Sequence, residues 1–209
     1  MGHSRRTFLR RAGVAVVGTV VAAAALPSPP PEQRPDRPVD PHEGEVPSIE
    51  TEAESGWALW QYSRERTGYE PTSPVNVVVS TAGTGHTLED VMAVFRRAGW
   101  VERPAEYVRF AYDAHHGRYD RQHATAAQTV HGGFGRHHIR AWSFEGFVSV
   151  QAHEDTAATP EHEIASYETT RHLIEWLFHD AGWTVKPDGA LFNNAKLPDH
   201  TGFVTVIEP

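Results

Sequence analysis

The chain has 209 residues, with 27 acidic side chains against 19 basic ones and no cysteine. This length predicts one domain with short appendages, and the missing cysteine excludes disulfide frameworks, thiolate nucleophiles, cysteine-ligated zinc and iron–sulfur clusters. The formal charge of −8 argues against a basic nucleic-acid-binding surface, so we expect no nucleic-acid partner. The chain is also rich in histidine, with 14 of these residues, and 17 of its 19 basic residues are arginine.

The N-terminus has the pattern of an export signal. Arg5 and Arg6 form a twin-arginine pair, and an apolar run over residues 12–26 follows them. That run has 15 residues, fewer than the roughly 20 that span a bilayer. We therefore predict a twin-arginine signal peptide with Ala23 and Ala25 at its A-x-A-like cleavage site. Retention as an uncleaved membrane anchor is the alternative.

Export would take the protein through the twin-arginine translocase to the extracellular side, the cell surface or a periplasm-like space. Because this route carries folded substrates, the domain would fold before export without disulfides, or acquire a cofactor there. Loss of the four arginines of the signal would change the formal charge from −8 to −12. Such an acidic, arginine-dominated chain fits a halophilic archaeon, where salt screens self-repulsion, and equally a GC-rich genome.

The composition divides the chain into three segments. Residues 1–25 form the predicted signal, and residues 26–54 form a Pro/Glu-rich, disordered linker. Eight of the fifteen prolines lie between residues 27 and 48. Residues 55–209 form the predicted globular domain, which is long enough to bury about 70% of its unfolded surface in one core.

Two similar strand–helix patterns predict the fold class. A β-branched strand over residues 75–79 is followed by an amphipathic helix over residues 88–98, and the strand over residues 147–150 by a helix over residues 166–181. Each helix is followed by a Gly-Trp pair. We predict an α+β or α/β fold with a mixed β-sheet of five to seven strands and two main helices in a duplicated strand–helix unit.

A predicted hairpin in the middle of the chain places the candidate site residues. Residues 138–144 alternate between two faces, which puts His138 and Arg140 on one face and His137 on the other. Glu145 and Gly146 would form the turn into the next strand. That strand ends in a His–Glu–Asp run. Polar side chains therefore lie at the end of a strand and in the loop after it, where functional sites are often built.

Four side chains are candidate ligands for a divalent metal such as zinc: His138, His153, Asp155 and His162. The candidate catalytic residues are His138, Arg140 and Asp155, and Arg140 would bind an anion. The alternatives are proton-transfer catalysis without a metal, and ordinary surface or hydrogen-bonded histidines. No cofactor is certain from the sequence.

Several segments together resemble the LssY C-terminal domain family. They are Pro74-Val75-Asn76-Val77-Val78-Val79, Ala98-Gly99-Trp100, Gly135-Arg136-His137-His138-Ile139-Arg140-Ala141-Trp142 and His153-Glu154-Asp155. The resemblance implies that residues 55–209 are a domain of this family. The family is found fused to membrane-embedded, lipid-phosphatase-type domains, so the resemblance also implies work near a membrane. It assigns no catalytic residue.

The sequence leaves three functions open. We expect an exported, membrane-proximal or cell-surface domain that binds a ligand or partner, with a membrane surface or envelope component as a possible partner. The alternative is a metal-dependent hydrolase that uses the His/Asp site on a phosphorylated or lipid-derived substrate. The third possibility is a structural envelope protein.

Overall fold

The computed structural model describes residues 46–129, 135–156 and 163–209. The predicted signal residues Arg5, Arg6, Ala23 and Ala25 therefore lie outside the described residues, as does His162. Within the described ranges, no helix combines the length and the apolar character that a membrane span requires.

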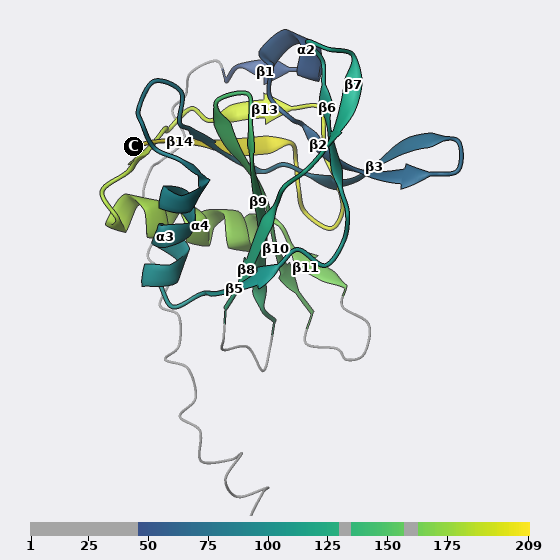
Figure 1. The fold of residues 1–209 in the computed structure, drawn as a ribbon. Helices are drawn as coiled ribbons and strands as arrows, with labels where there is room; N and C mark the ends of the chain where they lie inside the picture. The colour runs from purple at the N-terminus through teal and green to yellow at the C-terminus, as the bar shows by residue number, and fades with distance from the viewer. Residues whose placement is uncertain (1–45, 130–134, 157–162) are drawn as a thin grey trace, which may run out of the picture. The chain divides into compact units, whose positions relative to one another are not determined.

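The fold is a mixed α+β arrangement with two main helices, as the sequence predicts, but it has more strands (Figure 1). Among the described residues, a sheet of ten strands and a second sheet of four strands replace the predicted single sheet of five to seven. Four strands of the large sheet have only two or three residues, too few to show an alternating pattern, which explains part of this difference.

The large sheet contains the predicted central hairpin. In spatial order its strands are β1 (Ser48–Ile49), β13 (Ala190–Phe192), β14 (Phe203–Glu208), β4 (Val77–Ser80), β10 (Phe147–Asp155), β9 (His137–Phe144), β8 (Thr125–Gln128) and β5 (Val101–Pro104), with β11 (Ile164–Ser166) paired to β10 and β12 (Thr184–Val185) paired to β14. β4 and β14 are parallel, as are β1 and β13, and the other described pairs are antiparallel. Glu145 and Gly146 form the β9–β10 turn with φ of 48° and 83°, as a tight hairpin turn requires.

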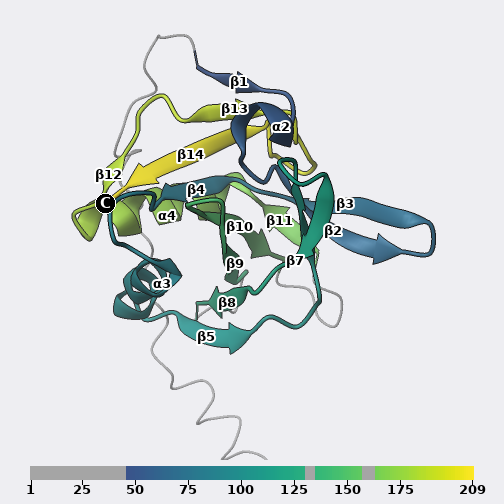
Figure 2. The same ribbon diagram turned by 45° about the horizontal axis from the view of Figure 1, so that its top comes forward.

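The small sheet lies beside the large one and carries a cluster of aromatic rings. Its order is β3 (Gly68–Pro74), β2 (Trp60–Glu65), β6 (Phe110–Asp113) and β7 (Arg118–Arg121). The β2–β3 hairpin extends away from the rest of the fold (Figure 2). Tyr69 stacks on Tyr119 with ring centroids 4.0 Å apart, which ties the projecting hairpin to β7.

The two main helices end in the same way. Helix α3 (Leu88–Arg97) and helix α4 (Glu168–Asp180) are each followed by alanine and then by glycine in the left-handed region, with φ of 81° at Gly99 and 87° at Gly182. In both cases the next residue, tryptophan, donates its N–H to a phenylalanine carbonyl five residues earlier, at 3.0 and 2.9 Å.

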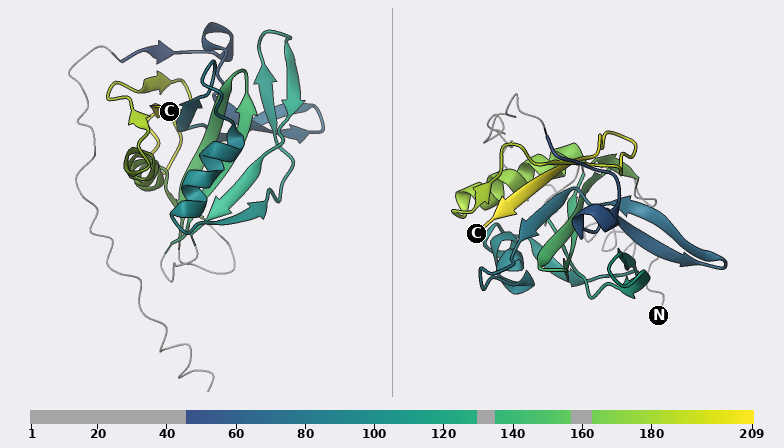
Figure 3. Two further views of the ribbon diagram at one scale, coloured as in Figure 1. Left: turned by 60° about the vertical axis from the view of Figure 1, so that its left-hand side comes forward. Right: turned by 90° about the horizontal axis from the view of Figure 1, so that it is seen from above.

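Two core clusters occupy opposite faces of the large sheet. On one face both helices pack on the strands, and Phe95 of α3 meets Phe178 of α4 edge to face with centroids 5.6 Å apart (Figure 3). On the other face Trp142 of β9 packs with Ala111 of the small sheet. Burial of such large apolar side chains stabilises the fold by about 1.5–3 kcal/mol each.

The folded region begins earlier than the sequence predicts. β1 pairs with β13, and the short helix α2 (Glu52–Ser55) follows it, although both lie in the predicted linker of residues 26–54. The Tyr62 hydroxyl donates a hydrogen bond of 2.9 Å to Glu52. These two elements lie before residue 55, the predicted start of the domain, and a two-residue strand with a polar flank gives no signal in the sequence.

Candidate functional site

A cleft of about 570 Å³ lies on the face of the large sheet that the helices do not cover. Its floor is made by β8, β9 and β10. Gln61 of β2 and Ser73 of β3 line it from the small sheet, and the segment between β5 and β6 completes it. A volume in this range suits a small-molecule ligand.

The strand register arranges the floor in two rows. Arg140 of β9 is the direct partner of Gln151 of β10, and His138 is the direct partner of His153. Direct partners have Cβ atoms about 5 Å apart, and the two rows lie about 7 Å apart, the rise of two residues in a strand. Arg140 and His138 therefore share one face, as the alternation in the sequence predicts.

Asp155 joins the two histidines. Its Oδ2 lies 2.8 Å from His138 Nε2, and its Oδ1 lies 3.1 Å from His153 Nε2. The two imidazole rings are stacked with centroids 5.5 Å apart. The strand pairing of β10 with β11 is irregular between Glu154 and Asp155, and such irregularities often re-aim a side chain beside a site. The structure thus brings three of the four predicted metal ligands together.

The carboxylate of Asp155 is strongly biased towards its charged form. Burial by itself would raise the pKa of Asp155, but the close contacts with His138 and His153 outweigh it and hold this pKa well below its usual range. His153 is also held from its other side, because Gln151 Nε2 lies 2.8 Å from His153 Nδ1.

Nε2 of His138 is buried and has no hydrogen-bond partner at a favourable angle, although the Asp155 carboxylate is near it. The charged carboxylate of Asp155, at 2.8 Å, is the neighbour that compensates this nitrogen.

The described residues do not fit a metal centre. Across the described ranges, no group of three or more His, Cys, Asp or Glu side chains is arranged to hold a metal ion. The fourth predicted ligand, His162, lies outside those ranges. The zinc site proposed from the sequence stays a prediction.

Arg140 is the most unusual charge in the cleft. Its Nη2 donates to the carbonyl of Tyr107 at 2.7 Å and its Nε donates to Gln122 Oε1 at 3.4 Å, but no carboxylate of the described residues forms an ion pair with it. Burial first, and the charge of Arg109 second, lower the pKa of Arg140 from 12.5 to about 10. The guanidinium is thus partly desolvated and lacks a counter-ion within the described part of the chain.

Three further arginines line the cleft: Arg103, Arg109 and Arg136. Gln128 accepts from Arg103 Nε and Nη2 at 3.2 and 3.3 Å when its amide oxygen faces that side chain. Gln61 is 2% exposed, and its Nε2 has no hydrogen-bond partner. The cleft therefore presents N–H donors without acceptors, next to the unpaired charge of Arg140.

Sequence reasoning identified only part of this cleft. It singled out His138, Arg140, His153 and Asp155, which share the β9–β10 hairpin. It missed Gln61, Arg103 and Arg109 in the walls and Gln151 in the floor. Gln151 lies two residues before His153 on β10 and faces the same side, so the period-2 pattern of the strand could have identified it. The others come from distant segments with no motif of their own.

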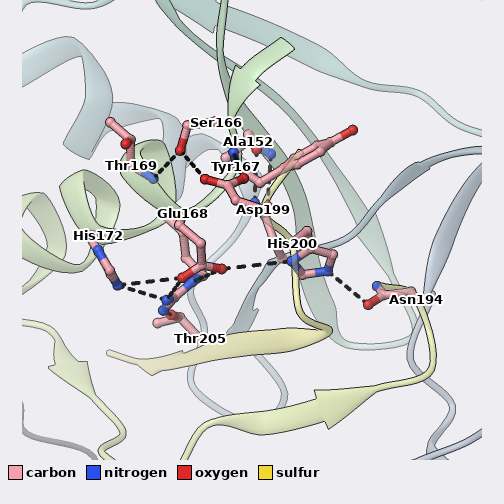
Figure 4. Close-up of polar contacts among 12 residues, drawn as sticks. Ala152, Ser166, Tyr167, Glu168, Thr169, His172, Asn194, Asp199, His200 and Thr205 are labelled. Atoms are coloured by element: carbon pink, nitrogen blue, oxygen red, sulfur yellow. Dashed lines mark hydrogen bonds and ion pairs between the residues drawn. The ribbon is translucent and has the colours of Figure 1, made fainter. Parts of the chain in front are cut away.

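A second polar cluster lies under helix α4 and is structural (Figure 4). Arg171 is buried and donates to Glu175 Oε1 at 2.7 Å and to Thr205 Oγ1 at 3.0 Å. Nearby, His200 Nε2 lies 2.9 Å from Asn194 Oδ1, and Asn194 donates to two backbone carbonyls. None of these residues lines the cleft.

Glu168 belongs to this second cluster. Burial would raise its pKa, but contacts with His200 and Arg171 outweigh that effect and lower the pKa of Glu168 to about 2. The carboxylate is therefore charged throughout the physiological range and anchors the start of α4 (Figure 4).

We compared the chain with models of known protein families, with curated proteins and with solved structures, and none of the three comparisons gave a match. The resemblance to the LssY C-terminal domain family stays a prediction. The chemistry of the cleft is therefore the basis for assigning a function.

Proposed function

We propose that this protein is an exported domain that binds an anionic ligand in the cleft, through a phosphate, sulfate or carboxylate group. The observation that carries the proposal is Arg140, a partly buried guanidinium that forms no ion pair with any described carboxylate. A buried charge without a counter-ion is costly. An anionic ligand would remove that cost, and a guanidinium binds such oxyanions with two parallel hydrogen bonds.

The rest of the lining supports the same class of ligand. Four of the chain's 19 basic residues line this one cleft, in a protein with 27 acidic side chains. The two carboxylates of the lining are Glu106 and Asp155, and Asp155 is already engaged by two histidines. The unpartnered Nε2 of Gln61 is a donor, which also favours a ligand rich in acceptor oxygens. The cleft volume of about 570 Å³ leaves room for a larger ligand around the anionic group.

Calorimetric titration with inorganic phosphate, sulfate and phosphate monoesters tests the proposal. Arg140→Gln is expected to weaken binding at least tenfold, since a charge-assisted hydrogen bond contributes about 1.5–3 kcal/mol. Arg118→Gln is the matched control, because Arg118 is exposed and pairs with Asp120 at 3.1 Å outside the cleft. Absence of binding by the unaltered protein, or equal loss in both variants, would overturn the proposal.

A hydrolase is the second candidate function, and the position of His138 favours it. An anion on Arg140 would lie one row from His138, whose Nε2 contacts the charged Asp155. A carboxylate in this position stabilises the imidazolium that forms when histidine takes a proton. His138 would then take the proton of an attacking water, or give one to the leaving oxygen of a phosphoester.

Hydrolysis of p-nitrophenyl phosphate and bis(p-nitrophenyl) phosphate separates this candidate from simple binding. The assay is run with and without added zinc, alongside elemental analysis of the purified protein. A loss of kcat at saturating substrate in His138→Gln, beyond any loss of phosphate affinity, would establish acid–base catalysis. One equivalent of bound metal would support a metal-dependent hydrolase in which His162 is a ligand. Absence of turnover in every condition would leave ligand binding as the function.

Export, location and ancestry are further parts of the proposal. The Arg5–Arg6 pair supports the twin-arginine route, and the proline-rich stretch supports a position at the cell surface or close to the membrane. The matching ends of α3 and α4 support a duplicated strand–helix unit. The Arg136–Trp142 run of β9 supports the likeness to the LssY C-terminal domain family, and the arginine bias supports a halophilic source.

A further inference from the structure

The segment over residues 104–109, which we call the lip, borders the mouth of the cleft and projects apolar side chains. Tyr107 is 63% exposed and Val108 is 50% exposed. Among the described residues only three other large hydrophobic side chains are exposed, and one of these, Val101, lies on the neighbouring strand β5. Isolated exposed hydrophobic residues are ordinary, but an adjacent aromatic and aliphatic pair at the mouth of a polar cleft is a feature that needs a partner.

Basic side chains surround this apolar pair. Arg103 precedes the lip, and Arg109 ends it with its guanidinium 5.2 Å from the centre of the Tyr107 ring. Aromatic residues and arginine are favoured together where a protein meets a bilayer, because the ring lies at the headgroup level and the guanidinium reaches the phosphates. The lip and the preceding Arg103 thus combine an apolar tip with two arginines against one carboxylate, Glu106.

The lip is also connected to the centre of the cleft. The carbonyl of Tyr107, the most exposed residue of the lip, accepts the 2.7 Å hydrogen bond of Arg140 Nη2. The residue that projects outward is therefore the residue that holds the unpaired guanidinium in place. A surface that receives the Tyr107 ring would lie next to the position of the anion.

We propose that the lip docks on an anionic phospholipid surface and that the anion in the cleft is the phosphate of a lipid headgroup. This inference rests on the proposed anion-binding function and names the source of the anion. A soluble anion would explain Arg140 but not the exposed Tyr107 and Val108, whereas a membrane explains both. The chain as a whole is acidic, so a region that gathers four arginines is the part best suited to contact anionic lipid.

The absence of cysteine allows a direct test on the full chain. Val108→Cys and Leu197→Cys are each labelled with an environment-sensitive nitrobenzoxadiazole dye and mixed with vesicles of phosphatidylcholine, with or without phosphatidylglycerol. Leu197 is the matched control, because it is 85% exposed and does not line the cleft. A dye at one position reports local insertion even if another part of the chain contacts the vesicle.

The dye at position 108 is expected to shift to the blue only with phosphatidylglycerol, and the dye at position 197 to stay unchanged. Arg140→Gln in the Val108→Cys background should weaken the response at least tenfold, and soluble glycerol phosphate should compete with it. No shift at position 108, with calorimetric phosphate binding intact, would overturn the lipid inference and leave the anion-binding function standing. No binding of either vesicles or phosphate would overturn both, and a shift that survives Arg140→Gln would show that the cleft does not bind the headgroup.

Discussion

His138 and His153 are direct cross-strand partners whose rings stack 5.5 Å apart, and both turn Nε2 towards the carboxylate of Asp155. The hairpin register creates this relationship, because it places the two histidines opposite each other on the face that the helices leave uncovered. A single carboxylate therefore orients both imidazoles beside Arg140. The chemistry of the cleft depends on this arrangement more than on any one residue.

Asp155→Asn is expected to destabilise the fold by about 1–3 kcal/mol at neutral pH, since it removes a buried charge that two imidazoles stabilise. Because the folded-state pKa of Asp155 lies below its unfolded value of about 3.9, its stabilisation is complete well above pH 4 and is lost as pH falls further. Urea unfolding from pH 7 to pH 3 measures this. The stability difference between the two proteins should shrink below about pH 4, and a constant difference would contradict the ion-pair assignment.

His137 and His138 are neighbours with opposite roles. His137 is 5% exposed and its Nδ1 lies 2.8 Å from Thr170 Oγ1, whereas His138 faces the cleft. His137→Ala should cost about 2–3 kcal/mol of unfolding free energy, because it leaves a cavity and an unpaired hydroxyl. It should leave phosphate affinity unchanged. His138→Ala should cost less, about 1 kcal/mol, because Asp155 keeps His153 as a partner.

Chemical denaturation and phosphate titration of the two histidine variants give four values to compare. The expected pattern is a stability loss in the His137 variant and an affinity loss in the His138 variant. The reverse pattern would show that the face assignment of β9 does not control function.

The buried pair of Arg171 and Glu175 can be replaced by two apolar side chains, which compares the stability of an ion pair with that of apolar packing at one site. Arg171→Met should cost about 3–5 kcal/mol, because it leaves Glu175 buried without its partner. The double variant Arg171→Met with Glu175→Leu should recover most of that loss, since two apolar side chains need no counter-ion. Thermal unfolding of the three proteins is the measurement. A double variant less stable than the single one would show that Glu175 stabilises the fold even without the arginine, through its hydrogen bond from Thr205.

Gly99 and Gly202 both have positive φ, of 81° and 94°, but only one of them is crowded. A methyl group at Gly99 would meet no atom within 4 Å, whereas one at Gly202 would overlap the carbonyl oxygen of Phe192. Gly99→Ala should therefore cost only the strain of the left-handed conformation, about 1–2 kcal/mol. Gly202→Ala should cost clearly more, since a backbone carbonyl cannot move aside easily. Equal melting temperatures would contradict this.

Local patterns predicted a large part of the hairpin and both helices. Alternation along β9 placed His138 and Arg140 together, and the glycine after each helix marked its end. Short strands were missed, because a two-residue strand such as β1 exists only through its pairing with β13. The lip and its arginines were not identified as part of a site, since no motif in residues 104–109 marks them.

The sequence by itself determined which face each side chain of β9 and β10 presents, because a strand turns successive residues to opposite sides. It also determined where the helices end. Only the tertiary structure decided that the segment around Arg109 and strand β2 with Gln61 meet that face, and that Arg140 has no carboxylate partner among the described residues. The physical reason is that these contacts join segments far apart in the chain. Whether a charged side chain is paired and desolvated depends on how deeply it is buried and how far it lies from other charges. The composition therefore indicated an acidic protein, and the fold placed four of its arginines around one cleft.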